Sequence, residues 1–147
     1  MKFVVVLLLF IVVVTVSGCQ SQPLPAAERG IEVTRVVDGD TFEIDEAVVR
    51  LLCIDAPEKR EPFYLNAKER LRELVDGTYI ILEEGSVDKD IYGRLLRYVY
   101  VGNVSVNEQL VREGLARAYI YNQTENNCSR MIELEQAAID DKAGMWD

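Results

Sequence analysis

One apolar stretch of the chain carries charged side chains whose types and spacing suggest chemistry. Residues 48–58 read VVRLLCIDAPE, so Arg50 stands inside an apolar run that is typical of a strand, and Asp55 follows the run directly. Arg50 and Asp55 have opposite parity, so a regular strand would point them to opposite faces. Pro57 ends the hydrogen-bonding ladder and holds the residue before it extended. We therefore expect the pleat to break near Ile54 and the two groups to converge.

The converging groups fit a site for a hard cation beside an anion clamp. Asp55 and Glu58 supply carboxylate oxygens, and the planar guanidinium of Arg50 can hold an oxyanion through two parallel hydrogen bonds. Asp38–Asp40, DGD, is a strong hairpin-turn signal. Other interpretations remain open from these residues alone, namely an ordinary tight turn, solvated loop carboxylates, and an arginine whose stem lies along an edge strand.

The composition narrows the chemistry. The chain has 147 residues with 49% apolar and 28% charged side chains, which suits one globular domain. It contains no histidine, which excludes Ser-His-Asp and Cys-His catalysis and histidine-containing zinc sites. The formal net charge of −9 does not indicate a nucleic-acid binder by bulk electrostatics. Catalysis would depend on Asp, Glu, Arg, Lys, Tyr or a hard metal ion.

The N-terminus has the pattern of an export signal. Lys2 precedes the apolar run Phe3–Val16, which is shorter than the ~20 residues that span a bilayer comfortably. VSGC, ending in Cys19, resembles the lipobox of prokaryotic lipoproteins, in which the cysteine is lipidated. We expect a signal peptide over 1–18 and a tether over 19–30, and export to a lipid anchor at the cell membrane or secretion. An uncleaved anchor or an ordinary secretory signal is the alternative.

The remaining residues, 31–147, have the pattern of a small mixed domain. Alternating apolar residues and turn signals predict five strands, over 31–37, 41–46, 47–54, 78–84 and 94–101. Helical spacing predicts three helices, over 63–75, 106–114 and 126–146. Three strands, a helix and two further strands are the order of a five-stranded Greek-key barrel of OB type. We therefore expect an α+β, mainly β, fold.

Five motifs in this order resemble the staphylococcal nuclease, or thermonuclease, family. They are VVDGDTFEI, VVRLLCIDAPE, DIYGRLLRYVY, VNEQLVREGLARAYIY and the closing GMW. The likeness covers essentially all of residues 31–146. The resemblance implies an OB-type barrel with three helices, in agreement with the element order.

The resemblance also implies roles for individual residues. Asp40, Asp55 and the main-chain carbonyl of Ala56 match the calcium ligands of the family. Three catalytic side chains of the family match Arg50, Glu58 and Arg94. Tyr92, Tyr119 and Tyr121 lie where the family places tyrosines against a bound nucleotide, although plain core packing also fits Tyr119.

Together these matches imply a calcium-dependent phosphodiesterase. It would act on DNA and RNA, with single-stranded DNA among its substrates, and leave 3′-phosphate ends. Glu58 would orient or deprotonate the attacking water, while Arg50 and Arg94 would stabilise the charge of the five-coordinate transition state. We expect a monomer. The rival interpretations are a non-catalytic nucleic-acid-binding module on an OB-fold lipoprotein and a lipoprotein that binds another ligand.

A disulfide is the last expectation from the sequence. If Cys19 carries lipid, Cys53 and Cys128 remain, and an exported protein matures where thiols oxidise. In the resembled fold the tail helix packs over the side of the barrel that holds Cys53. Two separate buried thiols are the alternative.

Overall fold

The computed structural model describes residues 30–120 and 128–147. The predicted signal peptide, the tether up to residue 29, Cys19 and Tyr121 lie outside these described residues. None of the helices in the described ranges is long and apolar enough to span a membrane.

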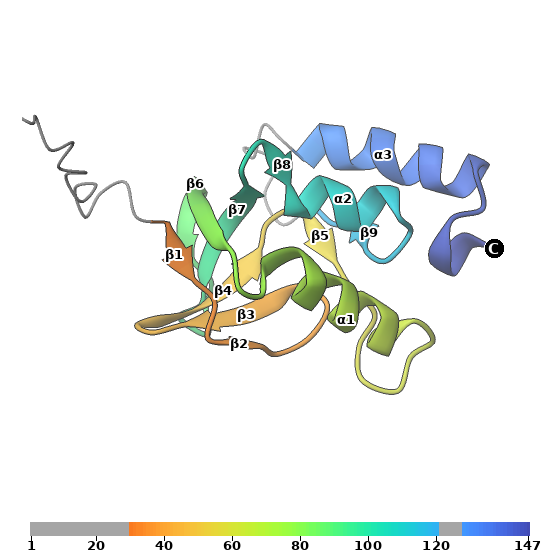
Figure 1. Ribbon diagram of the computed structural model, residues 1–147. Helices are drawn as coiled ribbons and strands as arrows, with labels where there is room; N and C mark the ends of the chain where they lie inside the picture. Colours follow the sequence, from red (N-terminus) through yellow and green to blue (C-terminus); the bar gives the residue numbers. More distant parts are fainter. Residues whose placement is uncertain (1–29, 121–127) are drawn as a thin grey trace, which may run out of the picture.

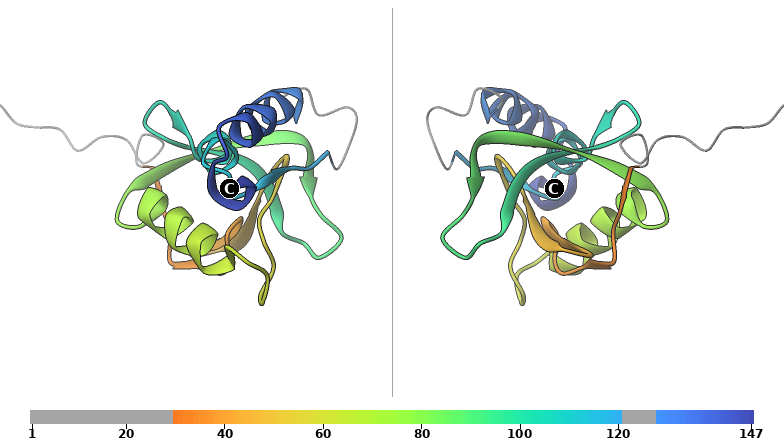
Figure 2. Two further views of the ribbon diagram at one scale, coloured as in Figure 1. Left: turned by 90° about the vertical axis from the view of Figure 1, so that its right-hand side faces the viewer. Right: turned by 90° about the vertical axis from the view of Figure 1, so that its left-hand side faces the viewer.

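One curled sheet forms the body of the molecule (Figure 1). Its strands are β1 (Ile31–Glu32), β2 (Arg35–Val36), β3 (Thr41–Ile44), β4 (Ala47–Leu51), β6 (Tyr79–Lys89), β7 (Leu95–Val101) and β8 (Val104–Ser105). The strand order is β1-β6-β7-β4-β3-β2, and β8 pairs with β7. β4 and β7 are parallel, and the other neighbours are antiparallel. β1 and β2 belong to one short segment yet pair at opposite ends of this order, so the sheet curls back on itself (Figure 2).

A second, two-stranded sheet lies beside the end of β4. It pairs β5 (Ile54–Asp55) with β9 (Arg117–Ala118) in antiparallel register. The chain therefore leaves the main sheet after Leu51 and resumes extended structure three residues later.

The inner faces of the strands form the core. Phe42 of β3, Val49 of β4 and Val99 of β7 are fully buried. Alternation along β4 buries Val49 and Leu51 and places Arg50 on the opposite face. The same strand thus supplies core packing and a charged side chain for a surface site.

Among the described residues, two helices pack against this sheet and a third packs on the second of them and on β9. They are α1 (Tyr64–Val75), α2 (Val106–Arg112) and α3 (Cys128–Asp140), and α2 lies between the other two (Figure 1). α1 buries Ala67, Leu71 and Val75, which recur every four residues and form one face. The hydroxyl of Ser105 caps α2 by accepting a hydrogen bond from the Glu108 backbone N–H at 3.3 Å.

The C-terminal turn docks onto the end of α2. A short 3₁₀ helix (Gly144–Trp146) follows α3, and the Met145 N–H donates to the Gly114 carbonyl at 3.0 Å. Gly114 has φ +65°, and a Cβ there would lie 2.0 Å from the Ala143 carbonyl oxygen, so this approach requires glycine. The tail is fixed near β9, where the Arg117 guanidinium lies 5.6 Å from the Trp146 ring centroid.

The structure confirms the predicted mainly β, OB-type fold with three helices. The first expected strand divides into β1 and β2, and the fourth extends to Lys89 with a register shift after Glu84. The expected tail helix is shorter than predicted, because α3 ends at Asp140 and the final turn is a separate 3₁₀ helix.

Candidate active site

The turn between β2 and β3 places Asp40 in the site. Asp40 is only 6% exposed, and its backbone N–H donates to the Asp38 carboxylate at 3.2 Å. The Leu51 N–H donates to the Asp40 carbonyl at 2.9 Å and fixes the turn against β4. A Cβ on Gly39 would lie 2.7 Å from the Cβ atoms of both Ala56 and Ala67. The glycine between the two aspartates therefore allows this close approach.

A break in the strand brings Arg50 and Asp55 together. Arg50 Nη2 lies 2.8 Å from Asp55 Oδ1, although the two residues have opposite parity. Cys53 adopts a left-handed backbone with φ 61°, which reverses the alternation between β4 and β5. The sequence predicted a break near Ile54, and the structure confirms it, with the turn at Leu52 and Cys53 directly before that residue.

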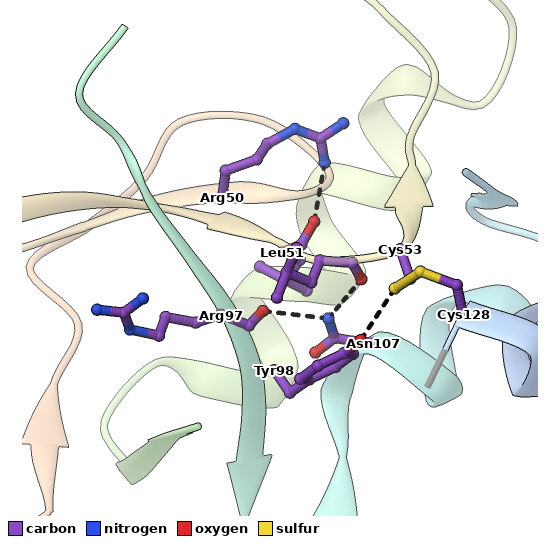
Figure 3. The surroundings of a disulfide bond; sticks show 8 residues. Arg50, Leu51, Cys53, Arg97, Tyr98, Asn107 and Cys128 are labelled. Carbon is purple, nitrogen blue, oxygen red and sulfur yellow. Dashed lines mark hydrogen bonds between the residues drawn. A yellow bond between two sulfur atoms is a disulfide. The ribbon is translucent and has the colours of Figure 1, made fainter. Parts of the chain in front are cut away.

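The side chain of Asn107 explains where the strand breaks. Leu52 N–H donates to the Arg97 carbonyl at 2.9 Å, which is the last parallel bond to β7. The fully buried Asn107 amide then accepts from Val99 N–H at 2.9 Å and donates to the Leu52 carbonyl at 2.9 Å. In a continued parallel ladder, Val99 N–H would bond to the Leu52 carbonyl itself. The amide of α2 therefore occupies the next rung and separates the strands (Figure 3).

Arg50 bridges two carboxylates. Its Nη1 lies 2.6 Å from Asp40 Oδ2 and its Nη2 contacts Asp55, while its side chain is 14% exposed. Burial, reinforced by the nearby Asp38 charge, raises the pKa of Asp40 to about 7. Three groups oppose this increase in pKa only in part: the charge of Arg50, the hydrogen bond from the Ala56 N–H at 2.7 Å, and the hydrogen bond from the Thr41 hydroxyl. The neighbouring groups of the protein therefore do not fully compensate the cost of burying the negative charge of Asp40.

The donor set suits a hard cation. Asp40 and the half-exposed Asp55 offer carboxylate oxygens. Ala56, which stands between Asp55 and Pro57 in the sequence, offers a main-chain carbonyl. Oxygen ligands completed by water are what calcium prefers. In the described part of the chain no group of three or more His, Cys, Asp or Glu side chains could hold a metal ion. Any ion here would be held by few protein ligands, and its positive charge would compensate the negative charge of the buried Asp40 carboxylate.

Arg94 is held at the same site by Asp90. Arg94 Nε donates to Asp90 Oδ2 at 2.6 Å, while Asp90 Oδ1 accepts from the backbone N–H groups of Tyr92 and Arg94 at 2.9 and 3.0 Å. Burial alone would raise the pKa of Asp90, but these bonds and the arginine charge lower it below its ordinary value. Asp90 therefore stays ionised and orients Arg94.

The predicted catalytic and carboxylate residues line one cavity of about 250 Å³. Its wall includes Asp38, Asp40, Arg50, Asp55, Glu58, Asp90, Arg94 and Tyr119. Glu58 follows Pro57 and is exposed; its backbone N–H donates to the Glu61 carboxylate at 2.8 Å. The cavity therefore brings together the carboxylates of Asp40 and Asp55, two guanidinium groups and the exposed carboxylate of Glu58.

One of the predicted tyrosines lines this cavity, and a second lies beside Arg94. Tyr119 is 50% exposed and lines the cavity, and its N–H donates to the Cys53 carbonyl at 2.8 Å. The alternative interpretation, that Tyr119 is a core residue, is therefore wrong. Tyr92 is 79% exposed, and its ring centroid lies 5.5 Å from Arg94 Cζ. Tyr121 lies outside the described residues.

The structure contains a disulfide between Cys53 and Cys128 (Figure 3). Both cysteines are only 3% exposed, and Cys53 Sγ also lies 3.0 Å from the Tyr98 hydroxyl. The bond joins the turn between Arg50 and Asp55 to the first residue of α3. It spans 75 positions of the sequence.

The family model described as staphylococcal nuclease homologue matches residues 48–147, which is more than half of the chain. The chain belongs to the staphylococcal nuclease family. Two endonucleases of Bacillus subtilis (strain 168), the SPbeta prophage-derived endonuclease YokF and endonuclease YncB, are each 38% identical to it over 128 residues. These alignments cover 79% of this chain but only 43% and 61% of the two relatives. A thermonuclease of Staphylococcus hyicus is 31% identical, covering 82% of this chain and 78% of the relative.

Sequence reasoning missed three residues that organise this nuclease-family site. Asp90 orients Arg94 from four positions earlier, but both residues belong to a turn, and the sequence pattern carries no separate signal for this pair. Asp38 was interpreted only as part of a turn, yet it lines the cavity. Asn107 carried no local signal, because an asparagine in a short helix is usually exposed.

Proposed function

We propose that this chain is a calcium-dependent nuclease that hydrolyses phosphodiester bonds of DNA and RNA and leaves 3′-phosphate ends. One observation carries the proposal: Arg50 links the two candidate calcium ligands, Asp40 and Asp55, in a cavity that Arg94 and Glu58 also line. Membership of the staphylococcal nuclease family, and its similarity to an endonuclease and a thermonuclease, support the same function.

The two arginines retain donors for a phosphate. Arg50 forms ion pairs with Asp40 through Nη1 and with Asp55 through Nη2, and its Nη1 also donates to the Leu51 carbonyl at 3.4 Å; its Nε has no partner within the described ranges. Arg94 uses Nε on Asp90, and its two terminal nitrogens have no hydrogen-bond partner among the described residues, so they can bind an oxyanion. Planar guanidinium groups bind phosphate oxygens through paired hydrogen bonds. They would stabilise the negative charge that grows as the phosphorus becomes five-coordinate.

The hydrolysis can be assigned to this chain's own groups. Glu58 orients a water molecule and accepts a proton as the water oxygen bonds to phosphorus. The phosphorus–O5′ bond breaks on the opposite side, and the 5′-oxygen gains a proton from solvent beside Arg94. Asp40, Asp55 and the Ala56 carbonyl would hold calcium, which supplies Lewis-acid activation of the phosphodiester when bound. Because these groups contact backbone rather than bases, we expect cleavage of both DNA and RNA.

The test uses the purified full chain with a single-stranded DNA and an RNA oligonucleotide. With calcium we expect cleavage of both and 3′-phosphate ends by mass spectrometry; with a chelator we expect no cleavage. Equal cleavage in chelator, or none with ample calcium, contradicts the proposal. Calcium-independent retention on single-stranded DNA without cleavage would favour the non-catalytic binding module. A monomer is expected at the concentrations of the assay.

We also propose that the nuclease works outside the cytoplasm, tethered by lipid on Cys19 after removal of residues 1–18. The apolar run Phe3–Val16 and the following VSGC support this location. Mass spectrometry of the mature N-terminus should show a lipidated Cys19. An intact Met1, or an unmodified Cys19 after cleavage elsewhere, would contradict it.

A further inference from the structure

The disulfide is attached to the segment that shapes the proposed active site. Cys53 lies three residues after Arg50 and two before Asp55, and it lines the cavity that holds both. We propose that the Cys53–Cys128 bond is a positioning element of this site, so that the chain reaches its full cleavage rate only when the two sulfurs are bonded. This inference rests on the proposed nuclease function.

The backbone of Cys53 needs external support. Its φ of 61° lies in the left-handed region, which non-glycine residues adopt rarely and keep only where their surroundings hold them. This conformation reverses the side-chain alternation and allows Arg50 Nη2 to approach Asp55 Oδ1 at 2.8 Å. A relaxation of Cys53 toward an extended conformation would move Arg50 and Asp55 toward opposite faces.

Contacts on both sides of Cys53 are weaker than a covalent bond. Before it, the Leu52 carbonyl is held by Asn107; after it, the Cys53 carbonyl accepts from Tyr119 N–H. The side chain of Cys53 is held by the bond to Cys128 and by the nearby Tyr98 hydroxyl. The disulfide is thus the one covalent link, among the described residues, between the turn and another element.

α3 holds the segment from Cys53 to Asp55 at two points. Cys128, its first residue, is bonded to Cys53, and Glu135 accepts a hydrogen bond from the Ala118 N–H of β9 at 3.2 Å. β9 pairs with β5, so that Ala118 lies opposite Ile54 and its neighbour opposite Asp55. Breaking the disulfide would remove the direct link between α3 and the turn and leave the indirect path through β9.

Thiol–disulfide exchange determines when the Cys53–Cys128 bond forms or breaks, and so when the cleavage rate changes. Two thiols lose two protons and two electrons to a disulfide oxidant, which becomes two thiols; a dithiol reductant reverses the exchange and becomes a disulfide. Both sulfurs are buried, so exchange with the folded protein requires the packing of α3 to open. Oxidation during folding would therefore commit the enzyme to its active form, and a chain that folds in a reducing compartment would remain weakly active.

The experiment compares the oxidised full chain with Cys128→Ala, which removes the bond and leaves Cys53 in place. The matched control is Leu134→Ala, because Leu134 is a buried residue of the same helix that takes no part in the disulfide. Cleavage is measured with saturating calcium at a temperature where circular dichroism shows each variant folded. A variant that does not fold is measured in an osmolyte that restores folding.

We expect Cys128→Ala to lower kcat by roughly 10- to 100-fold, because small misplacements of catalytic groups have effects of this size. Leu134→Ala should lose thermal stability yet keep kcat within about 2-fold of the parent chain, since it leaves the crosslink intact. Treating the parent with a dithiol during refolding should reproduce the low rate, and refolding with oxidised glutathione should restore it. A folded Cys128→Ala chain with the parent kcat would overturn the inference.

Calcium affinity separates this inference from the proposed function. Isothermal titration calorimetry with calcium alone measures the calcium affinity, which depends on how Asp40 and Asp55 are placed and requires no cleavage. We expect Cys128→Ala to bind calcium at least about 10-fold more weakly than the oxidised parent, an effect typical of groups that orient metal ligands. If the oxidised parent binds calcium but cleaves nothing, the nuclease proposal fails. Equal calcium affinity in the parent and Cys128→Ala overturns the positioning role itself.

Discussion

Replacing Asn107 with alanine tests how the strand break is stabilised. The change removes an amide that accepts from Val99 N–H and donates to the Leu52 carbonyl, both at 2.9 Å, in a fully buried position. The Arg97 carbonyl, which the amide also contacts at 3.3 Å, keeps its bond from Leu52 N–H. Two buried backbone groups would therefore lose their partner.

The expected magnitude follows from those two groups. Each buried polar group left without a partner costs about 1–3 kcal/mol, so we expect a loss of roughly 4 kcal/mol in the free energy of unfolding. For a domain of this size the midpoint of thermal unfolding should fall by roughly 10–20 °C. The control is Gln109→Ala on the same helix, whose amide contacts only the partly exposed Glu113 and should cost at most about 1 kcal/mol.

Urea and thermal unfolding of the parent and both variants provide the assay. The result that would refute the reasoning is an Asn107→Ala chain as stable as the parent. Val99 N–H would then have bonded directly to the Leu52 carbonyl, and the strands would close without strain. In that case the amide would not be what maintains the break between Arg50 and Asp55.

Three further predictions concern the supporting residues. Burial alone would raise the pKa of Glu113, but hydrogen bonds from Arg70 and Gln109 and the Arg70 charge lower it, so its stabilisation is present above its ordinary pKa of 4.5 and lost as pH falls through the lowered value. Urea titrations should show Glu113→Gln less stable than the parent by about 1 kcal/mol at pH 7 and equal to it in strong acid; a gap that persists in acid would contradict the linkage. Asp90→Asn should lower kcat roughly 10-fold with little change in unfolding midpoint, because the amide nitrogen cannot accept from Arg94 Nε; an unchanged kcat would show that Arg94 needs no such partner. Reduction of the disulfide should lower the free energy of unfolding by about 4 kcal/mol, given a loop of 75 positions, and equal urea midpoints with and without reductant would contradict this.

The sequence predicted most of the fold because the fold depends on local patterns. The helix at α1 is readable from apolar residues at helical spacing, and the hairpin turn from the glycine between Asp38 and Asp40. The division of the first strand into β1 and β2 was not readable, since it results from pairing at both ends of a curled sheet. Closure of a sheet on itself depends on strands that are far apart in the sequence, so the local pattern of residues 31–37 does not indicate it.

The site was predictable to a similar degree and for a similar reason. The opposite parity of Arg50 and Asp55 pointed to a break in the strand, and the structure has such a break. The cause of the break was not readable from the strand, because it lies 55 residues away, in the side chain of Asn107 on α2. The role of Asp90 was equally hidden, since an aspartate in a turn is usually explained by the turn alone.

The most direct test of the account compares Arg50→Lys with Arg35→Lys. Arg50 spans Asp40 and Asp55 within the cavity, whereas Arg35 forms an exposed pair with Glu43 on β3. The measurement is the rate of single-stranded DNA cleavage at saturating calcium for both variants and the parent. We predict a loss of at least roughly 10³-fold for Arg50→Lys, because a point charge cannot replace the planar fork, and a rate within about 2-fold of the parent for Arg35→Lys. A folded Arg50→Lys chain that cleaves as fast as the parent would contradict the proposed active site.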